Sequence, residues 1–200
     1  MAVKVLNVTK EDDDAIDLDE RESQRCKRRQ MIKDMAQEIR MACRMAGSAT
    51  HAQHANLVML VGASLDQVYS LKIVYELIEG NDLEKLLAIM QSKSKTPWKP
   101  ELSMALSWSC QLMEAIAFLH SFDPPIIHRD VKPSNVMVSN DLRLVKLVDF
   151  GLCTPDPRDS RKMSGKTGSY RYMAPEVYLE SHSYSAKVRE LIVRRESILG

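Results

Sequence analysis

A turn rich in chemically capable side chains lies at residues 126–138, with the sequence IIHRDVKPSNVMV. Asp130 and Asn135 stand five positions apart in it, and Lys132 lies between them. A carboxylate can accept the proton of a hydroxyl group, an amide oxygen can bind a metal ion, and an ammonium group can neutralise charge on phosphate. These residue types predict phosphoryl transfer, provided that the neighbouring segments hold them together.

The sequence that follows predicts a β-hairpin, which would bring a second metal ligand to the turn. Two runs rich in β-branched residues, 136–138 and 142–148, are separated by the turn-forming residues SND. Folding the runs back on each other places Asn135 beside Asp149. Mg²⁺ takes few oxygen ligands from protein and completes its shell with water and substrate phosphates. Asn135 and Asp149 are therefore predicted to bind Mg²⁺.

Hydrophobic periodicity predicts the elements that surround this turn. Residues 1–8 and 70–80 are predicted to be strands, and residues 31–46, 82–91 and 102–120 to be helices. On two of the helices, apolar residues recur every three or four positions, which predicts the buried face. These residues are Met31, Met35, Ile39, Cys43 and Ala46 on the first, and Leu102, Leu106, Cys110, Met113 and Ala117 on the second.

Residues 11–30 form an acidic block followed by a basic one, EDDDAIDLDERESQRCKRRQ, with few side chains to bury. We expect a solvated insertion here. The basic part could be a nuclear-import or nucleic-acid patch, but a short basic run beside an equal acidic one favours a solvated helix face.

Composition restricts the class of protein. The chain has 200 residues, 44% of them hydrophobic, and a formal net charge of +1, which indicates a folded globular protein without a general affinity for nucleic acid or anionic membranes. The four cysteines show no metal-ligand spacing, which favours reduced thiols. No apolar run approaches the roughly 18 residues that span a bilayer. We expect a cytoplasmic protein, with the nucleus as the alternative location and with no nucleic-acid or membrane partner.

Three segments together resemble the catalytic domain of eukaryotic protein kinases of the Ser/Thr type. Within that family, their sequences look most like those of the tyrosine-kinase-like group. HRDVKPSN at 128–135 resembles the catalytic loop, DFG at 149–151 the metal-binding segment, and GSYRYMAPE at 168–176 the end of the activation segment. The three come in the order and at the intervals of that family.

The resemblance covers residues 2–188 and implies an α+β, two-lobed fold. Residues 1–80 would form part of the small β-rich lobe, with the charged insertion at 11–30, and residues 81–188 part of the helical lobe, followed by an atypical tail at 189–200. We expect the fold to be partial. The small lobe would lack its first strands with their glycine-rich loop, and the large lobe its last helices.

The resemblance also implies the role of each residue in the turn. Asp130 would accept the proton of the substrate hydroxyl, Lys132 would stabilise charge on the γ-phosphate of ATP, and Asn135 and Asp149 would hold Mg²⁺. A lysine two positions after the aspartate is the Ser/Thr-type arrangement, so Ser or Thr of a protein substrate is the expected acceptor. We expect Asp130→Asn to abolish transfer and to leave stability nearly unchanged.

Contacts with the nucleotide are implied in the same way. Lys4 resembles the strand lysine that binds the α- and β-phosphates, with Glu38 as its ion-pair partner and Glu22 as an alternative partner nearer in sequence. The residues expected around the adenine ring are Tyr75 at the gatekeeper position, the backbone of Glu76 and Ile78 at the adenine edge, and Met137 beneath the ring.

Phosphorylation by an upstream activating kinase is a further implication of the resemblance. Arg129, beside Asp130, could bind a phosphate on the activation segment, because a guanidinium group can form two parallel hydrogen bonds with phosphate oxygens. The candidate acceptors are Ser160, Ser164 and Thr167. Ser169 stands where the family commonly has a threonine that touches the catalytic aspartate and lysine.

Three functional hypotheses remain open at this point. The chain could be a Ser/Thr protein kinase, a catalytically inactive kinase fragment that acts as a binding module, or an incomplete gene model that does not fold alone. Intact Lys4, Asp130, Asn135 and Asp149 favour the first hypothesis. The sequence identifies neither the protein substrate nor the upstream regulator.

Overall fold

The computed structural model describes residues 2–7, 18–46, 54–64, 70–96, 98–155, 168–173 and 175. The chain divides into two compact units, one from Met1–Ala52 and Met59–Leu77, the other from Gln53–Val58 and Ile78–Gly200. The candidate phosphorylation sites Ser160, Ser164 and Thr167, and the predicted tail at 189–200, lie outside the described residues. The mixture of strands and helices confirms the predicted α+β class.

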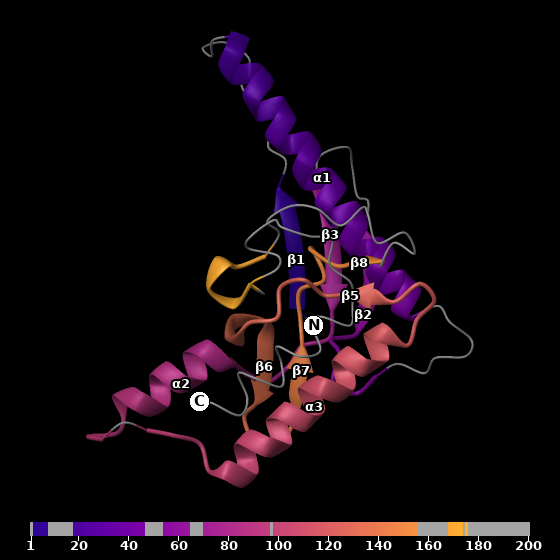
Figure 1. The fold of residues 1–200 in the computed structure, drawn as a ribbon. Coiled ribbons are helices and arrows are strands. Elements are labelled where there is room, and N and C mark those ends of the chain that lie inside the picture. Colours follow the sequence, from indigo (N-terminus) through magenta and orange to yellow (C-terminus); the bar gives the residue numbers. More distant parts are fainter. Residues whose placement is uncertain are drawn as a thin grey trace. The chain divides into compact units, whose positions relative to one another are not determined.

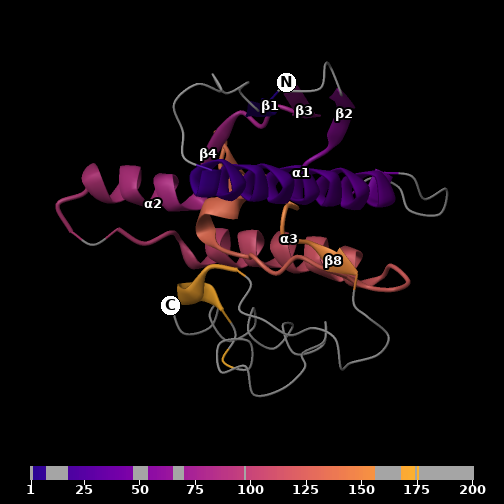
Figure 2. The same cartoon turned by 90° about the horizontal axis from the view of Figure 1, so that it is seen from above.

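The first unit is a three-stranded antiparallel sheet with one long helix along it (Figures 1 and 2). Its elements are β1 (Ala2–Asn7), α1 (Leu18–Ala46), β2 (Leu60–Ser64) and β3 (Ser70–Tyr75). The strand order is β1-β3-β2, so β3 is hydrogen-bonded on both edges. The predicted strand at 1–8 is confirmed, whereas the one at 70–80 ends earlier, at Tyr75.

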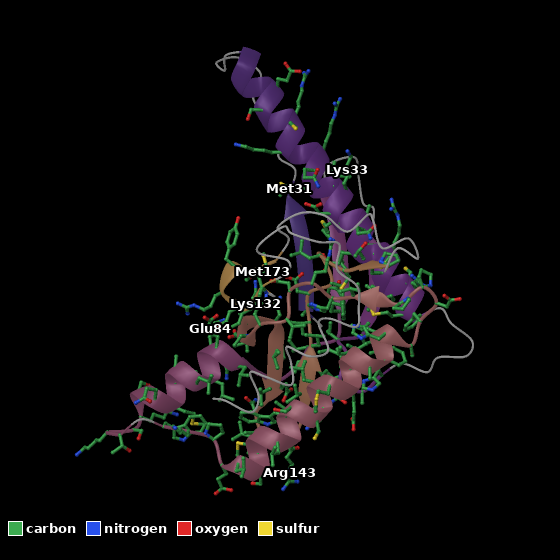
Figure 3. The ribbon with its side chains drawn as sticks, in the orientation of Figure 1. Met31, Lys33, Glu84, Lys132, Arg143 and Met173 are labelled. Atoms are coloured by element: carbon green, nitrogen blue, oxygen red, sulfur yellow. The ribbon has the colours of Figure 1, made fainter. Side chains whose placement is uncertain are left out.

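Helix α1 differs from its prediction in length and in its buried face. It begins at Leu18, so residues 18–30 of the charged block are helical. Its N-terminal half extends beyond the strands, and Met31 there is 48% exposed (Figures 1 and 3). Cys43 is also exposed, so the predicted apolar stripe was wrong at both positions. The buried residues of α1 are Met35, Glu38, Met41, Ala42 and Met45.

The second unit combines short strands with two helices. Its elements are β4 (Gly80–Asp82), α2 (Leu83–Ser92), α3 (Leu102–His120), β5 (Ile126–Ile127), the 3₁₀ turn η1 (Pro133–Asn135), β6 (Val136–Ser139), β7 (Val145–Leu147), β8 (Thr154–Pro155) and the 3₁₀ turn η2 (Tyr170–Tyr172). Strands pair in the order β4-β6-β7, and β5 pairs with β8. The predicted hairpin is confirmed by the antiparallel pairing of Val136 with Leu147, although its second strand is shorter than expected.

The buried face of α3 is the opposite of the predicted one. Every residue of the predicted stripe is exposed, with Leu102 at 74% and Leu106 at 53%, and the buried residues are Trp108, Ala115, Ile116 and Leu119. The prediction was wrong because α3 is apolar around most of its circumference, so that periodicity alone does not identify the face that packs.

Polar contacts attach α3 to the hairpin. The indole Nε1 of Trp108 donates to the carbonyl oxygen of Leu142 at 2.8 Å. Gln111 accepts from the backbone N–H of Val145 at 2.8 Å and donates to the carbonyl oxygen of Arg143 at 2.8 Å. By length and composition α3 could cross a membrane, which corrects the expectation that no apolar run approaches the length needed to span a bilayer. Core helices of soluble proteins pass the same test.

Candidate active site

The turn at 128–135 is held at both ends by buried strands. Ile126 and Ile127 of β5 are fully buried, and Val136 of β6 is 4% exposed. Asp82 caps the neighbouring helix α2 by accepting from the N–H of Lys85 at 2.8 Å. Because its flanks are fixed by packing, the turn can present polar groups in one arrangement.

His128 links the turn to the end of the hairpin. Its side chain is 3% exposed, and its Nδ1 accepts from the N–H of Asp130 at 3.3 Å. This bond places the ring proton on Nε2, which lies 3.2 Å from the carbonyl oxygen of Val148. The ring also meets Phe150 edge-on, with centroids 5.7 Å apart. His128 therefore acts as a structural brace between the Asp130 turn and the DFG segment.

Asp130 lies at the centre of a dense hydrogen-bond cluster. One carboxylate oxygen, Oδ2, accepts from Lys132 Nζ at 2.8 Å and from Asn135 Nδ2 at 2.9 Å. The other, Oδ1, accepts from the N–H of Ser169 at 3.0 Å and from its hydroxyl at 2.9 Å. Lys132 Nζ also donates to Ser169 Oγ at 2.8 Å, so Asp130, Lys132 and Ser169 form a closed triangle.

The cluster determines the charge of Asp130. Burial alone would raise the pKa of this carboxyl group, but the hydrogen bonds from Lys132 and Ser169 and the charge of Lys132 outweigh burial. The pKa of Asp130 is therefore lowered from its ordinary value of 3.8. The group is a carboxylate at neutral pH, as a proton acceptor must be.

Segment 168–173 meets the turn at 128–135 through a glycine that no other residue could replace without strain. Gly168 has φ +115°, and a Cβ at this position would overlap the carbonyl oxygen of Arg129. This close approach delivers Ser169 to Asp130. Lys132 of the turn and Met173 at the end of the segment are labelled in Figure 3.

Asn135 and Asp149 are the candidate metal ligands, and their donor atoms suit a divalent cation. Asn135 Nδ2 donates to both the backbone oxygen and the carboxylate of Asp130, at 2.8 and 2.9 Å, so the amide oxygen is the atom of this side chain that could bind a metal ion. The N–H of Val148 donates to the Asn135 carbonyl at 3.0 Å, so the next residue, Asp149, follows at the same end of the hairpin. Asp149 is exposed and has φ 65°.

Two oxygen donors of this kind fit Mg²⁺, which leaves most of its shell to water and phosphate. Within the described part of the chain, no group of three or more His, Cys, Asp or Glu side chains could hold a metal ion. The pair of Asn135 and Asp149 has one amide and one carboxylate, and is therefore not a group of that kind.

In the first unit, Glu38 is 2% exposed and accepts a hydrogen bond from the hydroxyl of Tyr75 at 2.7 Å. Glu22, the alternative partner for Lys4, is exposed on the same helix. Lys4 lies opposite Ile73 in the pairing of β1 with β3, and its side chain is outside the described part of the structure. The contact between Tyr75 and Glu38 was not predicted, because no periodic pattern links positions so far apart in sequence.

The residues expected around adenine lie at the end of β3, directly after it, and in β6. The N–H of Glu76 donates to the carbonyl oxygen of Met59 at 2.9 Å, and its carboxylate accepts from the N–H of Met59 at 2.8 Å. An adenine contact at Glu76 would therefore use its carbonyl group. Met137 is half-buried in β6, and Ile78 is partly exposed.

Comparison with known families matches residues 2–189 to the protein kinase domain. This chain therefore belongs to the protein kinase domain family, whose members use ATP and a divalent metal ion.

Individual relatives bear names of Ser/Thr kinases and related kinases. Mitogen-activated protein kinase kinase kinase 7 of Drosophila melanogaster is 35% identical over 156 residues, which cover 78% of this chain and 20% of the relative. Serine/threonine-protein kinase VIK of Arabidopsis thaliana is 33% identical over 165 residues, covering 80% and 34%. Calcium/calmodulin-regulated receptor-like kinase 2 of the same plant is 34% identical, covering 67% and 29%. The chain thus spans about a third or less of the length of these relatives.

Proposed function

We propose that this chain transfers the γ-phosphoryl group of ATP to Ser or Thr hydroxyl groups of protein substrates in intracellular signalling. The observation that carries the proposal is the cluster around Asp130, a charged carboxylate with a lysine 2.8 Å away and a serine hydroxyl 2.9 Å away. The hydrogen bond from the Ser169 hydroxyl supports the proposal, because a substrate hydroxyl would have to bind the same carboxylate. The family and the names of the relatives agree with it.

Each residue of the turn would have a separate role in the reaction. Asp130 Oδ1 would orient the substrate hydroxyl and accept its proton, a contribution of about 10²–10⁴-fold for a general base. The Ser169 hydroxyl, which donates to that oxygen in the structure, would either move away or remain bonded to it beside the substrate hydroxyl. Lys132, held by Asp130 and Ser169, would place its positive charge beside the transferring group.

Mg²⁺ is the proposed metal ion, with Asn135 Oδ1 and Asp149 as its protein ligands. When bound, it neutralises charge on the phosphate oxygens of ATP. Lys4 would bind the α- and β-phosphates with Glu38 as its ion-pair partner. The Glu76 carbonyl and the Ile78 backbone would bind the adenine edge, and Met137 would contact the ring.

Regulation and location follow as further proposals. Arg129 Nε donates to the Leu152 carbonyl at 2.6 Å, which fixes the guanidinium group near the start of the activation segment. Its terminal nitrogens would bind a phosphate added by an upstream kinase. We propose that the protein acts in the cytoplasm or nucleus, without a membrane or nucleic-acid partner. This proposal is supported by its four cysteines, none of which forms a disulfide, and by the hydrogen bonds that attach α3 to the hairpin.

The test is nucleotide binding followed by transfer. Thermal unfolding of the whole chain is measured with Mg²⁺–ATP, with ATP and EDTA, and without ligand. A ligand at 100 times its dissociation constant stabilises the native state by about 2.7 kcal/mol, so the midpoint should rise with Mg²⁺–ATP. Transfer of labelled phosphate to a generic Ser/Thr substrate is then measured.

The matched variants are Asp149→Ala, which should remove the Mg²⁺ dependence of binding, and Asp130→Asn, which should bind Mg²⁺–ATP and not transfer. Binding without transfer by the unmodified chain would contradict the proposal and indicate a binding module. A melting midpoint that does not change when nucleotide is added would contradict both the proposed kinase activity and a nucleotide-binding module.

A further inference from the structure

The hydrogen bond between Tyr75 and Glu38 joins helix α1 to the sheet of the first unit. The hydroxyl oxygen and carboxylate oxygen are 2.7 Å apart, and the two residues are 8% and 2% exposed. A buried carboxylate is costly unless it is paired and hydrogen-bonded, and hydrogen bonds to charged groups are the strong ones. The contact therefore fixes the position of Glu38.

The two ends of this bond lie on elements that are held in different ways. Tyr75 is the last residue of β3, the central strand, and pairs with Ala2 of β1 and with Leu60 of β2. Glu38 lies on the buried face of α1. Because β3 is hydrogen-bonded on both edges, we expect the strand to hold the tyrosine hydroxyl in place and the hydroxyl to hold the helix.

The sheet register relates Tyr75 to Lys4. Lys4 pairs with Ile73, which is two residues before Tyr75 on the same strand. Positions in this diagonal relationship share one face of an antiparallel pair and are separated by about 7–8 Å. The hydroxyl that holds Glu38 thus comes from the position diagonal to the proposed phosphate-binding lysine.

We propose that Tyr75 is a positioning residue, whose hydroxyl sets the rotation and height of α1 so that Glu38 is presented to position 4. The inference rests on the proposed function, because it assigns Glu38 a role in ATP binding. The ring of Tyr75 would fill the core equally well as phenylalanine, so the hydroxyl is the group that this role requires.

The experiment uses the whole chain with Tyr75→Phe, which keeps the ring and removes the hydroxyl. Ile73→Val is the matched control, because Ile73 is fully buried on the same strand and its truncation perturbs packing without touching the hydrogen bond. Hydrogen exchange without nucleotide should show faster exchange in α1 for Tyr75→Phe than for Ile73→Val.

Kinetics then separate positioning from packing. Tyr75→Phe should raise KM for Mg²⁺–ATP about tenfold, the size of one hydrogen bond to a charged group, and leave KM for the protein substrate unchanged. In a Glu38→Gln background the same substitution should change KM for ATP less than threefold, because the carboxylate through which it acts has been removed.

The outcomes distinguish this inference from the proposed function. An unmodified chain that binds and transfers, with a Tyr75→Phe variant whose KM for ATP lies within twofold of it, overturns the positioning role and leaves the function intact. An unmodified chain that neither binds Mg²⁺–ATP nor transfers overturns the function, and the positioning role with it. A tenfold rise that is lost in the Glu38→Gln background supports both.

Discussion

Asp130→Asn tests whether the cluster at the centre of the site exists in solution. The substitution keeps the size of the side chain, removes its charge and turns one acceptor atom into a donor. From the sequence we expected it to abolish transfer and to leave stability nearly unchanged. The geometry of the cluster supports the first expectation and revises the second.

The magnitude follows from the four bonds that Asp130 accepts. If the amide oxygen stays at the Oδ1 position, the two bonds from Ser169 survive. The new NH₂ group then faces two donors, Lys132 Nζ at 2.8 Å and Asn135 Nδ2 at 2.9 Å, so both of those bonds are lost. Hydrogen bonds to charged groups contribute about 1.5–3 kcal/mol each, and the Lys132 side chain is 23% exposed and therefore partly screened.

We expect a loss in the free energy of unfolding of about 2 kcal/mol, which corresponds to a fall in melting temperature of about 4–8 °C for a chain of this size. Urea unfolding at neutral pH measures the first quantity and calorimetry the second. Transfer should fall by about 10²–10⁴-fold.

The pH dependence of this loss supplies an internal control. Because the pKa of Asp130 is lowered in the folded protein, its contribution to stability is fully present above the ordinary value of 3.8 and is lost as pH falls through the lower folded-state value. The difference between the original chain and the Asp130→Asn variant should therefore be constant near neutrality and shrink in the acid range.

Ser169→Ala is the milder companion to this substitution. It removes the hydroxyl donor to Asp130 and keeps the backbone donor. We expect a smaller loss in the free energy of unfolding, of about 1 kcal/mol, and a raised pKa of Asp130, so that the acid limb of the pH profile of kcat/KM moves to higher pH.

The result that would refute the reasoning about the cluster concerns Asp130→Asn. It is an unfolding free energy at neutral pH equal to that of the original chain, or a transfer rate within tenfold of it.

Three further predictions concern elements that support the site. Gly168→Ala should lower the free energy of unfolding by about 1–3 kcal/mol, measured in urea, because its Cβ would strain a positive φ and overlap the Arg129 carbonyl. Gln111→Ala should cost about 1–3 kcal/mol in the same assay by leaving hairpin backbone groups without their side-chain partner. Leu106→Ala should change stability by less than about 0.5 kcal/mol, whereas Leu119→Ala should cost about 2–5 kcal/mol; equal effects would contradict the observed face of α3.

The proposed catalytic turn could be identified because its residues are close together in sequence. Asp130, Lys132 and Asn135 fall within one turn, and the hairpin that adds Asp149 is defined by two short strands and the turn between them. In such a segment, the order of residues fixes which side chains can meet. The family resemblance then supplied roles that residue types alone leave open.

The contacts that complete the site could not be derived in this way, because they join distant parts of the chain. Ser169 reaches Asp130 across 39 positions, and Tyr75 reaches Glu38 across 37. Nothing in local periodicity specifies such a pairing. The position of Ser169 was expected from the family pattern, whereas the bond from Tyr75 had no counterpart in the sequence argument.

The buried faces of α1 and α3 were predicted wrongly for the same physical reason, which concerns their polar residues. Both helices carry apolar side chains on several sides, so counting apolar positions selects a stripe without selecting the packed one. In the structure, each packed face includes a polar group with a specific partner, Glu38 with the Tyr75 hydroxyl on α1 and Gln111 with the hairpin backbone on α3. A buried polar group requires a partner. On these two helices the packed face is therefore the one whose polar residue has a partner elsewhere in the fold, and in α1 that residue is the one proposed to act on ATP.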